Sequence, residues 1–479
     1  MFDSSVKRNR LSFALMAIMV IPALCLADDG WRKPAVQPEV HRLILAVDVD
    51  HDAFENHFKG SEEELDRRLR EEFIPALNEA FTPETGILWE LGPVVARPNV
   101  NESPYADSHD GYEIYRRLRE NWEPRDDEFD RVICFTDRRI GVAGLAGGKW
   151  TVLTGVWGAW WHELSHTFGN PHGGRGTLET GSMSQRNDRR LLELEKTHRY
   201  TDTEVDSTWR ILAENADRFE RVQGPIDPYP PYARLDLAVI DSRTESSIII
   251  DPLDNDHDIN GDRIRISSFD SITRFGGSVK KTIREDDGVE VLRYTPPPGG
   301  RMMPDRFMYT LEDESGRTNR GHVVVQVLGT FDKDTEYEIT HTEEGRAIAG
   351  ETDGKINIGI HGSDLNAIAP LIRWKLEPAE EGGFYLHHVH TGMYLGYAGP
   401  RPSEGAEVLF IDPAEGQNPP RWTITHHSGV YFTLQPYGSE LRLLSPYPAS
   451  TPLTLGRPKN EVDKGYRSQF WVIDPLQSP

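Results

Sequence analysis

The sequence is poor in cysteine, with only Cys25 and Cys134 among 479 residues. Cys25 lies in an N-terminal segment that we expect to be removed, which would leave Cys134 as the only thiol of the mature chain. A single cysteine forms no disulfide within a chain, so the cross-linked frameworks of small secreted domains are excluded. Cys134 lies in the apolar run Arg131–Phe135, which predicts a core thiol rather than a reactive one.

Basic residues are also scarce. The chain has 53 Lys and Arg against 77 Asp and Glu, for a formal net charge of −24. An acidic surface repels nucleic acids and anionic membranes, so we exclude both as main partners. Beyond the N-terminal run 11–26, no stretch is long and apolar enough for a membrane span, so we expect no transmembrane segment in the mature chain.

Residues 1–27 have the pattern of a signal peptide. Lys7, Arg8 and Arg10 precede the apolar run Leu11–Leu26, and Ala27 follows it. A basic start, a short apolar run and a small residue at the end are typical of export signals. We therefore expect a secreted or periplasmic protein. A lipoprotein is the less favoured alternative, because Leu is a poor residue directly before a lipidated cysteine.

The length and a hydrophobic content of 37% predict about three folded domains. Residues 28–224 alternate strand and helix signals, which predicts an α/β fold for the first domain. The expected strands are Leu43–Val49, Ile87–Val95, Val132–Thr136 and an edge strand within Ala143–Leu153. The expected helices are Ser61–Ala80, Tyr112–Trp122, Val156–Phe168 and a closing helix from Thr201 to about Phe219.

Residues 162–172 form the pattern HExxHxxGxxH. On a helix, His162 and His166 stand four residues apart on one face, so both imidazoles can reach one ion. Gly169 suits the left-handed end of a helix and Pro171 cannot continue one, so the chain turns back and brings His172 to the same ion. Three imidazoles predict a Zn²⁺ site with a fourth position for water.

Glu163 follows the first of these histidines and is the candidate general base. It can take a proton from the water at the metal and pass it to a leaving amine. The alternative is an ordinary surface helix, which the short HExxH pattern alone leaves open. The five fixed positions together are rare by chance and favour the zinc site.

The motif resembles that of the metzincin metallopeptidases, in which a Met-turn follows the third histidine. The resemblance implies that Met183, in Gly181–Ser184, forms this turn beneath the metal. Upstream, Gly144, Leu145 and Ala146 resemble the edge strand of reprolysin-like metzincins, which implies pairing with an extended substrate. The chain departs from astacins and serralysins, because no tyrosine follows Met183, and from animal reprolysins, because it lacks their disulfides.

Four prolines in Gly224–Pro231 predict a stiff linker. Residues 232–330 then show short strand signals separated by turns, which predicts an all-β sandwich. The expected strands are Leu237–Ile240, Ser247–Ile250, Ile264–Ser267, Val289–Tyr294, Phe307–Leu311 and His322–Val327. An early Asp-rich loop, the stretch Gly276–Val279 and the run from Asp305 to Tyr309 resemble bacterial immunoglobulin-like or cadherin-like repeats, which implies a spacer or adhesive role.

The Asp-rich loop contains five oxygen-bearing side chains that could converge on one Ca²⁺. Two alternatives stay open: a calcium site, or a solvated acidic loop. The spacing departs from an EF-hand because the glycine comes late and no glutamate closes the loop. The candidate ligands are Asp254, Asp256, Asp258, Asn260 and Asp262.

Residues 332–479 contain an internal repeat. Trp374, Trp422 and Trp471 recur 48 and 49 residues apart, and each opens a short strand. Three copies predict an all-β trefoil, and the single Gln469-Phe470-Trp471 resembles the QxW of ricin-B-type lectins. That family implies glycan binding, but the stretches at Arg346, Met393 and Leu441 lack the Asp of its binding repeats. We expect the tryptophans to be core rather than ligand platforms.

The sequence therefore predicts a secreted multidomain zinc endopeptidase that acts on a protein or glycoprotein substrate, with C-terminal domains for spacing and targeting. The alternative is a non-enzymatic adhesin or carbohydrate-binding protein that has a metallopeptidase-like fold. The intact pattern of histidines and Glu163 favours the enzyme, whereas the trefoil lacks its expected sugar-binding Asp.

Overall fold

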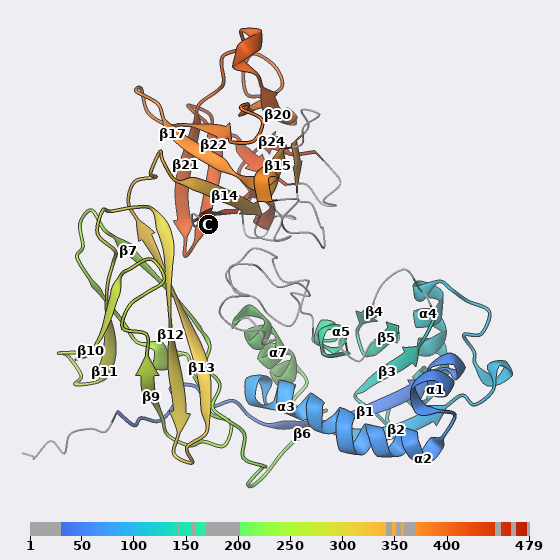
Figure 1. The fold of residues 1–479 in the computed structure, drawn as a ribbon. Coiled ribbons are helices and arrows are strands. Elements are labelled where there is room, and N and C mark those ends of the chain that lie inside the picture. The colour runs from blue at the N-terminus through green and yellow to red at the C-terminus, as the bar shows by residue number, and fades with distance from the viewer. Residues whose placement is uncertain are drawn as a thin grey trace, which may run out of the picture.

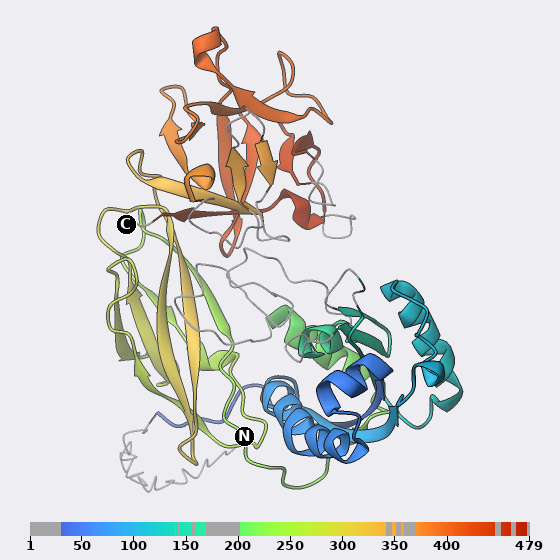
Figure 2. The ribbon, with the colours of Figure 1, turned by 45° about the vertical axis from the view of Figure 1, so that its right-hand side comes forward.

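The computed structural model describes residues 30–138, 140, 144–154, 160–168, 202–341, 347–350, 356–358, 369–445, 452–460 and 466–476. Three regions follow one another along the chain, a mixed sheet with helices and then two all-β domains (Figures 1 and 2). His172 and Met183 lie outside the described residues, as does the expected signal peptide. Within the described residues, no helix is long and apolar enough to cross a membrane.

The first domain is built on a sheet with the strand order β2-β1-β3-β5-β4. Four of these strands are parallel, and β4 lies antiparallel to β5 at the edge. The short β6 pairs antiparallel with β1. The strands are β1 (His41–Val49), β2 (Ile87–Ala96), β3 (Arg131–Thr136), β4 (Gly144–Gly147), β5 (Trp150–Thr154) and β6 (Glu220–Arg221).

Helices pack on both faces of this sheet. The expected helix after Ser61 is present, and the Ser61 hydroxyl caps it by accepting from the Glu64 N–H at 3.2 Å. It runs as α2 (Glu62–Arg68), a π-helical turn η1 (Leu69–Phe73) and α3 (Ile74–Thr85), and ends at Gly86, whose φ is 75°. The remaining helices are α1 (His51–Phe58), α4 (Gly111–Trp122), α5 (Trp160–His166) and α7 (Asp202–Glu214). The first domain also has the short 3-10 turns η2 (Val100–Glu102) and η3 (Glu123–Arg125). Similar turns in the two later domains are η5 (Pro252–Asp254), η6 (Ala369–Ile372), η7 (Pro413–Glu415) and η8 (Tyr466–Gln469).

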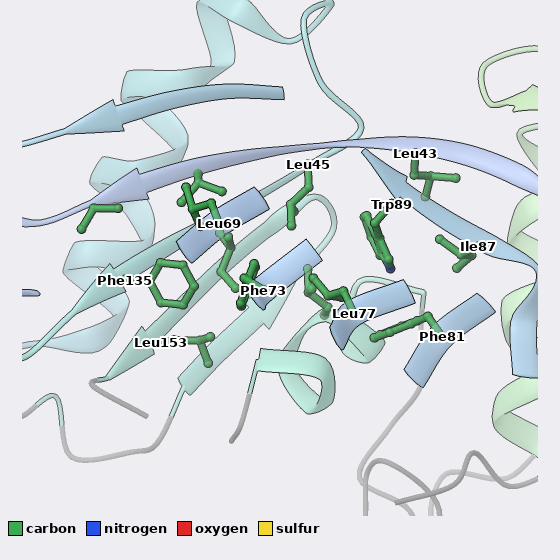
Figure 3. Close-up of a cluster of buried hydrophobic side chains, with 14 of the residues drawn as sticks. Leu43, Leu45, Leu69, Phe73, Leu77, Phe81, Ile87, Trp89, Phe135 and Leu153 are labelled. Carbon is green, nitrogen blue, oxygen red and sulfur yellow. The ribbon is translucent and has the colours of Figure 1, made fainter. Parts of the chain in front are cut away.

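Side chains of β3 alternate between two hydrophobic cores. Ile133 and Phe135 belong to the core shared with η1 and α3, whereas Val132 and Cys134 belong to the core beneath α4. Figure 3 shows the first of these cores. The prediction of a core thiol is confirmed, because Cys134 is buried and burial raises its pKa far above the ordinary value.

The second domain is a sandwich of two sheets, with strand orders β7-β13-β12-β9 and β10-β11-β8. Apolar residues of both sheets enclose one core that includes Ile240, Leu292 and Tyr309. β7 runs parallel to β13, and the other pairs are antiparallel. The strands are β7 (Leu235–Asp241), β8 (Ile248–Ile250), β9 (Ile264–Phe269), β10 (Ser278–Ile283), β11 (Glu290–Thr295), β12 (Met303–Asp313) and β13 (Thr318–Leu328).

The third domain repeats one four-strand unit three times, as expected of a trefoil. Trp374, Trp422 and Trp471 are each fully buried. Their indole N–H groups donate to the carbonyl oxygens of Ile348, Leu395 and Leu443 at 2.8, 2.9 and 3.2 Å. The described strands are β14 (Glu336–His341), β15 (Ile348–Gly350), β16 (Ile356–Ile358), β17 (Trp374–Pro378), β18 (Phe384–His388), β19 (Tyr394–Tyr397), β20 (Val408–Ile411), β21 (Trp422–Ser428), β22 (Tyr431–Pro436), β23 (Arg442–Leu444), β24 (Thr454–Gly456) and β25 (Trp471–Pro475).

The sandwich contacts both of its neighbours. Toward the first domain, the ring of His257 lies with Nε2 2.9 Å from the carbonyl oxygen of Pro83 in α3. Toward the trefoil, Val324 packs with Val430 and Val472 in one apolar cluster. The β-sandwich is therefore in contact with both the first domain and the trefoil.

Candidate active site on helix α5

Helix α5 contains the first half of the zinc motif. His162, Glu163 and His166 all lie within Trp160–His166, so the helical spacing predicted for the two histidines is present in the backbone. The helix packs beside β4 and β5 (Figure 1). The side chain of His162 and the whole of His172 and Met183 lie outside what the structure describes. The three-histidine ligand set and the Met-turn therefore stay predictions.

Glu163 is buried, with 4% of its surface exposed. Burial raises the pKa of its carboxyl group to about 7, because a charged carboxylate loses hydration there. A carboxyl group with a pKa near neutrality is suited to both accept and return a proton. The position and the environment of Glu163 are thus compatible with the role of a general base.

Gly144 at the start of β4 makes room for Glu163. A Cβ atom on Gly144 would lie 2.5 Å from Cγ and 2.7 Å from Oε1 of Glu163, closer than such atoms approach. The sequence pattern placed Gly144 only in a substrate-binding strand. The structure adds that this position must be a glycine, because any side chain there would overlap the side chain of Glu163. Nothing in the local sequence indicated this requirement.

The predicted edge strand is an edge strand in the structure. β4 contains Gly144, Leu145 and Ala146 and pairs with β5, with Leu145 opposite Val152. Among the described residues no strand pairs with the other side of β4, and its residues are half-buried. Such an edge can accept an extended peptide as an added strand. Substrate binding at this edge stays a prediction.

Arg131 supports the C-terminal end of α5 from β3. Its guanidinium is buried, donates from Nε to the Thr167 hydroxyl at 2.9 Å and lies 4.6 Å from the ring centre of Phe168. Burial lowers the pKa of Arg131 to about 10. In the sequence, Arg131 only opens an apolar run, and a charged residue in such a run is the signal that could have indicated this contact.

The structure corrects the predicted calcium ligands. Asp254 is exposed. Asp256 is used by the fold, because it accepts from the Arg234 N–H at 2.7 Å and the Tyr309 hydroxyl at 2.7 Å. The side-chain oxygen of Asn260 accepts from the Tyr229 N–H at 2.9 Å. These three side chains do not join the other two.

Asp258 and Asp262 do come together, and Asp313 joins them. One carboxylate oxygen from each residue lies within 4.8 Å of the others. Burial raises the pKa of Asp258 to about 6. Asp313 was not among the expected residues because it follows Asp262 by 51 positions, outside any local motif.

The trefoil carries an aromatic and carboxylate cluster on its second repeat. The rings of His387 and Tyr394 stack with centroids 4.8 Å apart and planes 22° apart. Glu377 accepts from the Tyr394 hydroxyl at 3.1 Å, and its other oxygen lies 3.0 Å from Nδ1 of His387. All three side chains are half-buried, unlike the three repeat tryptophans, which are confirmed as core.

Comparison with known proteins gives one family match. Residues 228–326 match the bacterial Ig domain family, which confirms the immunoglobulin-like prediction for the second domain. This match includes no residue of α5 or β4. No curated protein matches the chain.

Several solved β-trefoil structures are similar to part of the chain. The ricin B-like lectin of Macrolepiota procera, solved with lactose, has 19% identity and a TM-score of 0.25, and covers 30% of this chain and 98% of its own. The Rhizoctonia solani agglutinin has 16% identity and a TM-score of 0.24, and covers 31% and 100%. The designed protein ThreeFoil has 18% identity and a TM-score of 0.24, and covers 30% and 100%. None of these matches is a peptidase.

Proposed function

We propose that this chain is an exported zinc-dependent endopeptidase whose C-terminal domains bind or position its substrate. The observation that carries the proposal is the buried position of the Glu163 side chain. This buried carboxyl group lies on the helix of the HExxH motif and against Gly144 of an edge strand. A surface helix with a chance HExxH would not require a buried glutamate beside a strand edge of this kind.

The donor set suits zinc. Histidine nitrogens are preferred zinc ligands, and α5 carries two histidines one helical turn apart. His162, His166 and His172 would hold the ion. When bound, zinc would polarise a carbonyl group and lower the pKa of a water molecule.

The chain's own residues would orient the substrate and move the proton. The edge of β4 that no described strand pairs with would hold the peptide extended through backbone hydrogen bonds. Glu163 would accept a proton from the attacking water at a carboxylate oxygen and donate it to the leaving nitrogen as the C–N bond breaks. Burial near β4 would keep this carboxyl group ready for both steps.

The test is a cleavage profile of new peptide N-termini with the purified protein and its Glu163→Ala variant. We expect the variant to retain zinc, because Glu163 is not a ligand, and to lose peptidase activity by about 10²-fold or more. Glu120→Ala, at an exposed position of α4, is the matched control and should cleave at the wild-type rate. Equal cleavage by Glu163→Ala would remove the mechanism.

The second candidate is a non-enzymatic exported adhesin that binds carbohydrate. The family match covers an Ig-like domain and no part of the α5 site, so it fits this candidate better than the peptidase. In the trefoil, the half-buried Tyr394 and His387 offer aromatic faces, and Glu377 beside them offers carboxylate oxygens. Sugars present apolar C–H faces and hydroxyl groups that suit this combination.

Glycan binding by the full chain separates the candidates. An adhesin would bind glycans through the trefoil, lose binding in Tyr394→Ala and show no cleavage in the wild type. An enzyme with a targeting trefoil would show both activities, with Glu163→Ala removing only cleavage. Cleavage without glycan binding would leave the trefoil without a carbohydrate role.

A further inference from the structure

Three buried or half-buried carboxylates meet where the second domain faces the first. Asp258 and Asp262 lie in the loop between η5 and β9, and Asp313 ends β12 in the adjacent hairpin. One oxygen of each lies within 4.8 Å of the others. Two chain segments thus direct acidic groups to one point, which is costly unless a positive charge compensates them.

The hydrogen bonds of this cluster leave two oxygens unused. Oδ1 of Asp258 accepts from the N–H groups of Asn260 and Asp262 at 2.8 and 3.3 Å. Oδ1 of Asp313 accepts from the N–H groups of Ser315 and Arg317 at 2.9 and 2.8 Å. The two carboxylates are therefore held in fixed orientations by one oxygen each.

Oδ2 of Asp258 and Oδ2 of Asp313 have no hydrogen-bond partner within the described part of the chain. The two side chains belong to residues that are 0% and 1% exposed. A buried carboxylate oxygen without a donor is rare in folded proteins, and a bound ion is one of the few partners that would satisfy it. Hydrogen bonds within the cluster satisfy Oδ1 only, so they do not account for Oδ2.

We propose that Asp258, Asp262 and Asp313 bind one Ca²⁺. Calcium prefers oxygen ligands, takes six to eight of them in flexible geometry, and tolerates water or backbone carbonyls in the remaining positions. Magnesium requires a near-ideal octahedron and gives up its water reluctantly. Carboxylates from a loop and a hairpin tip, each already oriented by backbone N–H groups, suit the larger ion.

The ion would link the two domains through the loop. His257 precedes Asp258, is fully buried, and reaches the carbonyl oxygen of Pro83 in the first domain at 2.9 Å. From the N-terminal segment of the first domain, the Gln37 amide donates to the carbonyl oxygen of Asp258 at 2.8 Å. Calcium at Asp258 would therefore order a loop that both domains share, and its binding would stabilise the contact between them.

The test uses the full chain after a chelator has removed bound metal. Calorimetry measures the heat of binding as CaCl₂ is added, and thermal unfolding measures the melting temperature with and without CaCl₂. We expect one binding event and a rise in melting temperature on the order of 5 °C at saturating calcium. Asp313→Asn should abolish both, since Asn keeps the Oδ1 acceptor but removes the charge. Asp254→Asn is the matched control, because Asp254 is exposed and ends η5 directly before this loop, and should respond as the wild type does.

Two further variants keep the result decisive. Asp262→Asn changes a half-buried ligand and should also lose the response, which covers the case in which Asp313→Asn does not fold. His166→Ala should keep the calcium response, which separates this site from the proposed zinc site. A wild type without heat of binding, an equal rise with MgCl₂, or an Asp262→Asn variant that responds fully would overturn the proposal.

Discussion

The first domain and the trefoil bury polar groups in different ways. In the trefoil, one contact is repeated three times: the indole N–H groups of Trp374, Trp422 and Trp471 each donate to a backbone carbonyl. In the described part of the first domain, buried polar side chains make contacts of several kinds. Asp48, for example, accepts from the indole of Trp122 at 2.7 Å and from the hydroxyl of Tyr105 at 3.1 Å.

This difference helps to separate structural from functional residues. A contact that recurs in every repeat serves the fold, because each repeat must close its own part of the core. Asp48 occurs once but is bound by several donors, so it too is accounted for by structure. Glu163 differs from both, since burial raises its pKa to about 7 on a helix that carries metal-ligand histidine spacing. The unrepeated, perturbed carboxyl group is the better site candidate.

The largest effect should come from filling the space beside Glu163. Gly144→Ala would place a Cβ 2.5 Å from Cγ of Glu163, so the carboxyl group must move. A displacement of about 1 Å at a reacting group costs roughly 10²-fold in rate, and we expect that loss in kcat/KM on a peptide substrate, with zinc content unchanged.

Gly147→Ala in the same strand is the control for this change. Its Cβ would meet only the phenol group of Tyr115, with the hydroxyl oxygen at 3.1 Å and Cζ at 3.9 Å, so activity should stay within a few-fold of the wild type. Equal activity in Gly144→Ala and the wild type would separate β4 from the site. Zinc loss in Gly144→Ala would instead show a disturbance of α5.

The first domain also shows which strands and helices local sequence patterns predict. The strands β1, β2 and β3, the helix that begins after Ser61, and α4 were predictable, because apolar periodicity and the cap at Ser61 are local signals. The helix α1 (His51–Phe58) was missed, since its apolar positions are few and it follows β1 almost directly. The range Ala143–Leu153, in which one edge strand is expected, instead contains most of a hairpin of β4 and β5 that turns at Gly148, with φ of 58°.

A second effect, of intermediate size, tests the threefold equivalence of the trefoil. Trp374→Phe, Trp422→Phe and Trp471→Phe each remove one indole donor and leave a buried carbonyl oxygen without its partner. We expect each to cost about 1–3 kcal/mol in the free energy of unfolding, measured by urea denaturation of the full chain. Tyr437→Phe, at an exposed position of the trefoil, is the control and should cost much less. A substitution that is neutral in one repeat alone would show that the repeats are not energetically equivalent.

The acidic loop shows that local sequence patterns do not predict which carboxylates come together. Five alternating oxygen donors in Asp254–Asp262 predicted a site built from one loop, but the fold uses Asp256 and Asn260 for hydrogen bonds to other segments. The third carboxylate, Asp313, comes from the hairpin after β12, and its approach depends on how β9 pairs with β12. Such a pairing is a tertiary property, which no spacing within the loop encodes.

The smallest effect concerns pH and a position at which the trefoil repeats differ. His388 faces Trp374 across the β17–β18 pair, and the equivalent partner of Trp422 is Pro436. Burial lowers the pKa of His388, whose ring contacts the Leu371 carbonyl and the Thr391 hydroxyl at 2.9 Å each. Because the folded pKa lies below that of the unfolded chain, stability is full above the unfolded pKa near 6.5 and falls as the pH drops toward the folded pKa.

His388→Gln should therefore flatten this dependence. Glutamine can accept from Thr391 and donate to Leu371 but does not titrate, so the free energy of unfolding should fall less between about pH 7 and pH 5 than in the wild type. The measurement is urea denaturation at both pH values, with His390→Gln, an exposed neighbour, as the control that keeps the wild-type slope. An unchanged slope in His388→Gln would mean that other buried groups carry the acid sensitivity. A flattened slope would assign part of it to His388, one of the two histidines that lie opposite a repeat tryptophan; the other is His341, opposite Trp471, whereas Pro436 lies opposite Trp422.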